Sequence, residues 1–149
     1  MTIAAEFDTV IARSVADVFA ELAAVERYPE WLVASGIVRV ERAPGPLGQG
    51  TPLRIEQRIA GRATTLEGAI TAFEPGSRLA FRAKDREGIS VEADALLAAD
   101  GAACRLHWSI RIGLPLKYRL FESMAAPEAK RAAASDLENL RRRLDAVAG

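Results

Sequence analysis

Few residues of this sequence have the type and spacing that a reactive site requires. The chain has one cysteine, Cys104, and one histidine, His107, which excludes an internal disulfide and a zinc site made of Cys and His ligands. The two residues are three positions apart, so in an extended strand their side chains point to opposite faces. Cys104 is therefore interpreted as a buried structural thiol rather than a nucleophile. His107 is interpreted as the partner of Asp94 in a surface ion pair rather than as part of a catalytic dyad.

Three further polar side chains are candidates for a site. Tyr118 and Glu122 are weak candidates for a catalytic acid or base, because they fall in a segment that we predict to form a lid. Gln57 has two interpretations: its amide orients a bound ligand through a carbonyl or hydroxyl group, or it is hydrated beside a turn at Gly61. The glycines between 45 and 50 lack the Lys-Ser/Thr pair of a phosphate-binding loop. We predict no metal site and no cofactor.

The elements that must position these residues are mostly β-strands. Between 52 and 113, apolar and polar residues alternate with a period of two, which is typical of an antiparallel sheet with one buried and one solvated face. Gln57 and Cys104 fall on the apolar side of this alternation, and His107 falls on the polar side. Strands are predicted near 5–12 and at 37–42, 52–60, 63–73, 78–85, 89–98 and 103–113.

Four turn signals predict which residues face each other across these strands. All four signals agree on which face is buried, and one predicted pair, Glu56 and Glu67, is a like-charge contact. The predicted turns are two-residue turns at 100–101 and 61–62, a loop at 86–88 and a turn at 75–76. The predicted pairs include Ala95–Leu106, Ala93–Trp108, Ile55–Gly68, Gln57–Leu66, Phe81–Ala93, Ala83–Val91 and Ile70–Phe81.

Helix signals lie at the two ends of the sequence. Ser14 is a typical N-cap before apolar residues at helical spacing, and a second short helix is predicted with Pro29 at its first position. Near the C-terminus an apolar stripe indicates a long helix, with the basic triplet 141–143 on its solvated face. Because proline cannot donate the helix-interior hydrogen bond, we predict a kink or break near Pro127, with residues 115–125 forming a separate short helix or lid. The stripe consists of Ala133, Leu137, Leu140, Leu144 and Val147.

Together these elements predict an α+β fold in which a curved sheet wraps around a helix. A meander of seven strands must bury its apolar face, and only the C-terminal helix is long enough to cover it. Three small residues, Gly68, Ala83 and Ala93, fall in the middle of the concave face. Either they leave volume for an apolar ligand, or they let the helix pack closely against the sheet.

Length and composition narrow the range of functions. The 149 residues are predicted to form a single domain, 1–149, with twenty basic and twenty acidic side chains. The formal charge of zero argues against binding of nucleic acid or of an anionic membrane surface, and no stretch is long and apolar enough to cross a bilayer. No signal peptide is visible, so we expect a cytoplasmic protein. Seventeen arginines against three lysines are typical of a GC-rich bacterial gene, and a homodimer is left open.

Several short runs occur in a characteristic order. They are 18–22 in the first helix, Glu-Arg-Tyr-Pro-Glu-Trp at 26–31, Gly-Gln-Gly-Thr at 48–51, the turn region 73–81 and Leu-Glu-Asn-Leu at 137–140. In this order they resemble the SRPBCC superfamily, which includes START-type lipid-binding domains and, most similar to this chain, the polyketide cyclase/dehydrase branch. The resemblance implies a helix-grip fold: a seven-stranded curved antiparallel sheet wrapped around a long C-terminal helix, two short helices after the first strand, and a cavity between sheet and helix.

The cavity that the resemblance implies leads to a predicted ligand-binding set. Trp31 has two interpretations, as a residue that lines this cavity or as an ordinary core aromatic. The predicted ligand-binding residues are Trp31, Ile55, Gln57, Gly68, Ile70, Phe81, Ala93, Trp108, Leu120 and Met124.

We predict that the protein binds a small hydrophobic molecule in this cavity, such as a lipid, a polyketide or an aromatic metabolite. Its affinity would come mainly from burial of apolar area. One alternative is an enzyme of the polyketide cyclase, aromatase or dehydratase type, which requires Tyr118, Glu122 or Gln57 in the cavity. Another alternative is a module that regulates a partner protein and has only a vestigial cavity.

Overall fold

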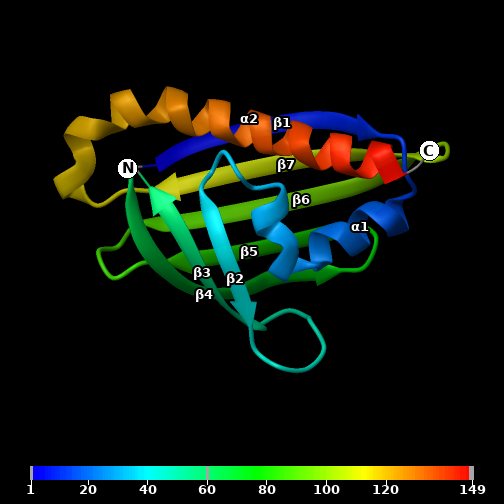
Figure 1. Ribbon diagram of the computed structural model, residues 1–149, viewed down its shortest axis with the longest axis horizontal. Coiled ribbons are helices and arrows are strands. Elements are labelled where there is room, and N and C mark those ends of the chain that lie inside the picture. The colour runs from blue at the N-terminus through cyan, green and yellow to red at the C-terminus, as the bar shows by residue number, and fades with distance from the viewer. Residues whose placement is uncertain (1, 60, 148–149) are drawn as a thin grey trace.

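The computed structural model describes residues 2–59 and 61–147 (Figure 1). The strands are β1 (Thr2–Ile11), β2 (Ile37–Arg42), β3 (Pro52–Ile59), β4 (Arg62–Glu74), β5 (Arg78–Lys84), β6 (Ser90–Asp100) and β7 (Ala103–Gly113). The helices are α1 (Val15–Ala23), the 3-10 helix η1 (Val25–Glu30), the 3-10 helix η2 (Leu116–Phe121) and α2 (Glu122–Val147).

The strands form one antiparallel sheet in the order β1-β7-β6-β5-β4-β3-β2. Figure 1 shows the sheet curving around α2, which contacts β1 at one side of the sheet. α1 contacts β5, β6 and β7, and η1 packs against β2. The predicted helix-grip fold, with two short helices after the first strand and a long helix at the C-terminus, is confirmed.

Alternation along the strands decides which side chains are buried. In β7 the buried residues Cys104, Leu106 and Trp108 alternate with the exposed Arg105 and the half-buried His107, as the sequence predicts. The predicted stripe of α2 is likewise buried at Ala133, Leu137, Leu140 and Leu144. The side chain of Val147, the last residue of that stripe, lies outside the described part of the structure.

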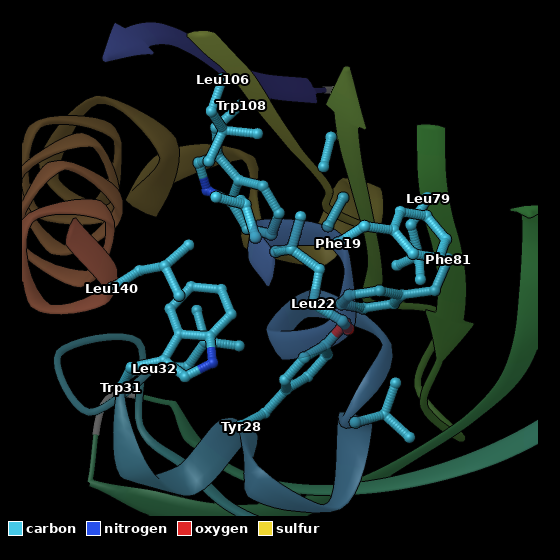
Figure 2. Packing of buried hydrophobic residues seen from close by; sticks show 14 of the residues in the cluster. Phe19, Leu22, Tyr28, Trp31, Leu32, Leu79, Phe81, Leu106, Trp108 and Leu140 are labelled. Atoms are coloured by element: carbon cyan, nitrogen blue, oxygen red, sulfur yellow. The ribbon is translucent and has the colours of Figure 1, made fainter. Parts of the chain in front are cut away.

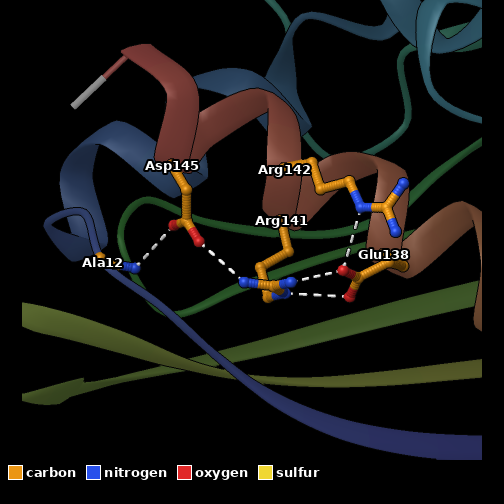
Figure 3. Close-up of polar contacts among 5 residues, drawn as sticks. All are labelled: Ala12, Glu138, Arg141, Arg142 and Asp145. Carbon is orange, nitrogen blue, oxygen red and sulfur yellow. Dashed lines mark hydrogen bonds and ion pairs between the residues drawn. The ribbon is translucent and has the colours of Figure 1, made fainter. Parts of the chain in front are cut away.

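Charged residues tie the last turns of α2 to the end of β1 (Figure 3). The backbone N–H of Ala12 donates to Asp145 Oδ1 at 3.1 Å, and Arg141 donates to Asp145 Oδ2 at 2.9 Å. Arg142 Nε lies 3.2 Å from Glu138 Oε1, one helical turn away. Arg142 is exposed, as predicted for a solvated helix face, whereas Arg141 and Arg143 are half-buried, and Arg143 pairs with Glu21 of α1 and Glu30 of η1.

The hairpin of β6 and β7 differs from the predicted register by two residues. Its turn lies between Asp100 and Ala103, one residue later than predicted, so Ala95 faces Trp108 rather than Leu106, and Ala93 faces Ile110 rather than Trp108. A shift of two residues leaves every side chain on its predicted face. The pattern of buried and exposed residues cannot reveal such a shift.

The hairpin of β3 and β4 shows the same two-residue shift. Ile55 faces Leu66 rather than Gly68, and Gln57 faces Thr64 rather than Leu66. The predicted contact between the like charges Glu56 and Glu67 was wrong, because in this register Glu56 faces Thr65 and Glu67 faces Arg54. The other two hairpins have the predicted register, with the pairs Ile70–Phe81, Phe81–Ala93 and Ala83–Val91.

The two prolines that were used as helix signals lie inside helices. η1 begins at Val25, so Pro29 is its fifth residue rather than its first. The helix η1 follows α1 and buries Val25 and Tyr28, which lie three residues apart, one turn of a 3-10 helix. The break predicted near Pro127 lies earlier, where η2 ends and α2 begins at Glu122. Pro127 lies in the second turn of α2 and has no N–H to donate to the carbonyl of Ser123. The helix tolerates this because Ser123 is exposed to water. The predicted separate short helix in 115–125 is confirmed as η2.

Gly68 lets β4 and β5 approach each other closely in the middle of the sheet. A Cβ atom on this residue would lie 1.8 Å from the carbonyl oxygen of Arg82 and 2.6 Å from the Cα of Ala83. The register shifts just beyond this point, between Ile70 and Ala72. The missing side chain of Gly68 therefore makes room for the backbone of β5, which differs from the interpretation that it leaves volume for a ligand.

We expect Gly68→Ala to destabilise the fold by about 3 kcal/mol, because the new methyl group must displace strand backbone rather than a flexible side chain. Chemical denaturation followed by circular dichroism measures this change. Gly48→Ala is the matched control: nothing lies within 4 Å of a Cβ built there, so its free energy of unfolding should stay within about 0.5 kcal/mol of wild type. Equal stability of the two variants would contradict the close approach at Gly68.

Candidate functional site

The concave face of the sheet is covered unequally, and one half of it is filled by aromatic side chains. The rings of Trp31 and Trp108 meet edge to face with centroids 5.7 Å apart, and Tyr28 lies 5.4 Å from Trp31 and 6.0 Å from Phe81. These four residues are buried. Figure 2 shows them between α2, which contributes Leu140, and the helices near the N-terminus. This half of the concave face is a packed core.

The other half of the concave face lies near the beginning of α2 and is less well covered. Trp108 is buried, but Ile110 and Ile112, the next residues of β7 on the same face, are only half-buried, and so is Val91 of β6. Toward its N-terminus, α2 continues its sheet-facing stripe with small residues, which are also half-buried. These are Ala125, Ala126 and Ala129. Apolar surface at this end of the sheet and the alanines at the start of α2 are thus both incompletely buried.

Large apolar side chains at the junction of η2 and α2 project into solvent beside this half. Leu116, Leu120, Phe121 and Met124 are between 58% and 86% exposed. We call these four residues the apolar rim.

The segment that carries the apolar rim is attached to the loop between β5 and β6. Glu87 of this loop accepts a hydrogen bond from the Tyr118 hydroxyl and lies 3.5 Å from Lys117 Nζ. The hydrogen bond from Tyr118 lowers the pKa of Glu87, and the same bond raises the pKa of Tyr118. η2 is therefore held over the end of the sheet by contacts at the protein surface.

Side chains of α2 and β3 hold the segment that follows Trp31. The buried carboxylate of Asp136 accepts the backbone N–H of Ala34 at 2.7 Å and of Ser35 at 3.0 Å. Asn139 donates to the Trp31 carbonyl at 3.1 Å, and Gln57 Nε2 donates to the Ser35 carbonyl at 2.8 Å. The sequence analysis missed Asp136 and Asn139. Asp136 lies one helical turn from both Ala133 and Leu140, so the helical spacing places its carboxylate on the buried face of α2. A carboxylate at such a position indicates a buried polar contact that the sequence could have revealed.

Three buried polar atoms within this packed region have no hydrogen-bond partner among the described residues. They are Nε1 of Trp31, Nε1 of Trp108 and Oε1 of Gln57. An unsatisfied buried polar group costs about 1–3 kcal/mol, and folded proteins contain few of them.

The predicted ligand-binding residues fall into three groups. Trp31, Ile55, Ile70, Phe81, Ala93 and Trp108 are buried on the concave side of the sheet, together with Gln57. Leu120 and Met124 belong to the exposed apolar rim, and Gly68 is used for the contact of β4 with β5. Their role in binding stays a prediction.

The candidate catalytic residues are not gathered at one point. The Tyr118 hydroxyl bonds to Glu87, whereas the Gln57 amide bonds to Ser35 on a different element. Glu122 is half-buried at the start of α2, on the stripe that faces the sheet. Burial raises the pKa of the Cys104 thiol, which agrees with its interpretation as a structural cysteine.

His107 forms an ion pair, but not with the predicted partner. Its Nδ1 lies 2.8 Å from Asp8 Oδ1, and this hydrogen bond raises the pKa of His107. Asp94 instead pairs with Arg78 at 2.8 Å. The shifted register of β6 and β7 explains the correction, because it places Leu96 rather than Asp94 beside His107.

Two open hollows, of about 600 and 450 Å³, lie at β2 and β3 rather than between the sheet and α2. Both are shallow, and charged side chains such as Glu41 and Arg42 line them. In the part of the chain that the structure describes, no group of three or more His, Cys, Asp or Glu side chains is placed to hold a metal ion. No helix within residues 2–59 and 61–147 has the length and apolar character needed to cross a membrane.

A curved antiparallel sheet with an apolar concave face, gripping a long C-terminal helix, defines the helix-grip class of proteins. The chain belongs to the family described as polyketide cyclase / dehydrase and lipid transport, whose model matches residues 2–145. This family lies within the SRPBCC superfamily, as the sequence resemblance predicts, and its members typically bind hydrophobic ligands.

Solved structures show the same fold. The Zhui aromatase/cyclase from Streptomyces sp. R1128 superposes with a TM-score of 0.78 at 16% identity, covering 100% of this chain and 99% of that one. A START superfamily protein from Mycobacterium smegmatis superposes with a TM-score of 0.75 at 13% identity, covering 97% of this chain and 98% of that one. A search of curated protein sequences found no match. At these identities the likeness establishes the fold.

The buried carboxylate of Asp136 should give the protein a specific pH dependence of stability. Burial raises the pKa of Asp136 above its usual value of 3.8, although hydrogen bonds from Ser35 and Ala34 oppose this effect. The folded protein then binds this proton more tightly than the unfolded chain does. As the pH falls from the raised folded pKa toward 3.8, the wild type should therefore gain unfolding free energy relative to Asp136→Asn.

Urea denaturation of both proteins at a series of pH values from 7 to 3.5 measures this difference, and the contributions of the other carboxylates cancel in the comparison. At neutral pH we expect Asp136→Asn to be less stable by about 1–3 kcal/mol, because the amide can accept only one of the two backbone hydrogen bonds. A stability difference that does not change with pH would show that the Asp136 pKa is the same in the folded and unfolded protein.

Proposed function

We propose that this protein binds a small hydrophobic molecule between the sheet and the N-terminal half of α2. The observation that carries the proposal is the incomplete burial of Val91, Ile110 and Ile112, which lie near the ends of β6 and β7 close to where the chain enters η2 and α2. Covering such a surface with an apolar ligand is favourable by roughly 25 cal/mol for each Å² of apolar area removed from water. Membership of a family that typically binds hydrophobic ligands supports the same conclusion.

The packing of the concave face decides where the ligand lies in this proposal. The aromatic cluster of Trp31, Trp108, Tyr28 and Phe81 occupies the half near the C-terminal end of α2, so a ligand there must displace side chains from a packed core. The half near the start of α2 needs no such displacement. A ligand in this position lies against the end of the aromatic cluster at Trp108 and beneath η2 and the apolar rim.

A large side chain on the sheet-facing stripe of α2 tests this location. Ala129→Trp places an indole ring against the half-buried face of the sheet, so we expect the affinity for the neutral solvatochromic dye Nile red to fall by about tenfold or more. Fluorescence titration of the dye gives the affinity. Native mass spectrometry of the purified wild type would detect molecules that co-purify with it.

Ala134→Trp is the matched control, because Ala134 is exposed on the same helix. It should bind the dye with the wild-type affinity. Both variants should keep the circular dichroism spectrum of the fold. A wild type that binds no Nile red, or an Ala129→Trp variant that binds as well as the control, would be evidence against the proposal.

Because η2 is held by Glu87, the proposal also predicts faster exchange of the ligand when this contact is removed. Glu87→Ala should raise both the association and the dissociation rate constants of Nile red by about threefold or more, with little change in affinity, as expected for a lid that opens more often. Stopped-flow fluorescence measures both rate constants. Glu92→Ala removes a different surface pair, with Arg82, and should leave them unchanged; equal rate constants in the two variants would mean that η2 does not limit entry.

A further inference from the structure

The charged side chains of this chain are distributed unevenly over the fold. Around α1, η1 and the last turns of α2, arginines form ion pairs with carboxylates; they are Arg13, Arg27, Arg42, Arg141, Arg142 and Arg143. Arg58, Arg62 and Arg86 belong to the opposite end of the sheet, where they are exposed and form no ion pair with any residue that the structure describes. A formal charge of zero for the whole chain therefore hides an excess of cations at one end.

The carboxylates at this end are engaged elsewhere or turned inward. Asp85 accepts two backbone N–H groups of its own loop, and Glu87 holds η2 through Tyr118. Glu67 has Lys84 as its neighbour across the strands. Glu122 is half-buried on the stripe of α2 that faces the sheet. The arginines at this end thus keep their charge available to a partner outside the chain.

These arginines surround the segment that carries the apolar rim. The strand pairing brings the hairpin of β3 and β4, the loop between β5 and β6 and the end of β7 to the same end of the sheet. The pKa of Glu87 is lowered mainly by the hydrogen bond from Tyr118, and the charge of Arg62 adds to this effect. Arg62 is therefore close to the contact that holds η2. Figure 1 shows the beginning of α2 at this end of the molecule, away from α1.

The apolar rim itself is unusual for a surface that faces only water. Leu116, Leu120 and Met124 follow one another at a spacing of four residues, and Phe121 lies beside them in the chain. All four side chains project from the surface and are mostly exposed. Apolar patches of this kind mark places where a protein contacts a partner or a membrane. A surface that covers the rim must therefore be apolar, and the surrounding arginines require it to be anionic as well.

A second copy of the chain meets neither requirement. Two rims in contact would bury roughly 800 Å² in total, if each large side chain contributes about 100 Å², whereas stable protein interfaces bury about 1,200–2,000 Å². A larger symmetric contact would bring the arginines of both copies together, and like charges repel. The apolar rim is thus a poor interface between identical chains.

A lipid bilayer with anionic headgroups meets both requirements. Its acyl region accepts projecting apolar side chains of any shape, and its phosphates attract arginines that lie beside them. We propose that this end of the molecule docks on the surface of an anionic membrane, with the apolar rim inserted and with Arg58, Arg62 and Arg86 over the headgroups. The inference goes beyond the proposed function and does not depend on it. It replaces the expectation from net charge, because docking responds to the local charge rather than to the sum over the chain.

Sedimentation with lipid vesicles measures this docking on the wild-type protein. We expect binding to vesicles made of equal parts of phosphatidylcholine and phosphatidylglycerol, and about tenfold weaker binding to vesicles of phosphatidylcholine alone. Added sodium chloride should weaken the binding to the anionic vesicles, because salt screens the charges of exposed arginines.

Matched pairs of variants locate the surface that binds. Leu120→Ala should lower the affinity for anionic vesicles by about tenfold, whereas Leu96→Ala, which changes an exposed leucine of β6, should leave it unchanged. Arg86→Gln should lower the affinity by about fivefold. Arg142→Gln removes the same charge from an exposed arginine of the paired end and should have no effect.

Phe121→Trp reports insertion directly. The two native tryptophans are buried, so an indole at position 121 is the exposed one. Its fluorescence emission should shift to shorter wavelength when anionic vesicles are added, because tryptophan leaves water for the membrane interface. A variant that sediments with the vesicles without this shift would show that the apolar rim stays outside the bilayer, which overturns the inference.

The remaining outcomes separate the inference from its alternatives. A wild type that binds no anionic vesicles, or that binds both kinds of vesicle equally, overturns it. Equal affinities of Leu120→Ala and Leu96→Ala would assign binding to another surface and would overturn it as well. A dimer in analytical ultracentrifugation that Leu120→Ala dissociates would mean that a second copy covers the rim instead. The titration of the wild type with Nile red in the absence of vesicles decides the proposed function separately.

Discussion

The structure depends on one geometric constraint: a single helix cannot cover seven strands. At about 4.8 Å between neighbouring strands, the sheet is roughly 30 Å wide, whereas a helix with its side chains is about 10 Å across. α2 therefore lies along one side, next to β1. Elsewhere the concave face is covered by α1, by η1 and by the aromatic cluster that includes Trp31. The stripe of α2 loses its leucines toward its N-terminus, and the sheet below that part is only half-buried. The proposed binding region is a consequence of this incomplete cover.

Much of the fold could be predicted because a strand has only two faces and most apolar residues of this chain must share one of them. The alternation assigns Leu106 and Trp108 to the buried face without reference to any partner strand. The residues that face each other across two strands are harder to predict. Moving a turn by one residue shifts the strand pairing by two residues and leaves every side chain on the same face of the sheet. The hairpins at Gly61 and Gly101 both shifted in this way. The like-charge pair of Glu56 and Glu67 was the one sign of an error, and the true register removes it.

The candidate site was less predictable, because its properties depend on contacts between distant segments. The sequence indicated that Trp31, Gln57 and Trp108 lie on the concave side, and all three are buried. The sequence placed Leu120 and Met124 in the ligand-binding set and did not indicate that both side chains would be exposed. It also could not assign the role of Gly68, which is set by the backbone of a strand that lies opposite it in the sheet. Asp136 was open to prediction, because a carboxylate on an apolar helix stripe must find donors.

The packed half of the concave face holds the residues around Trp31 in one geometry beside the loosely covered half. Recognition of a ligand by hydrogen bonds requires polar groups that are dry and held in one geometry, because a mobile or hydrated donor gains little from a new partner. Asp136 and Asn139 hold the segment around Trp31, and the edge-to-face contact holds Trp108 against it. The well-packed core tolerates the cost of the three unsatisfied atoms, about 1–3 kcal/mol each.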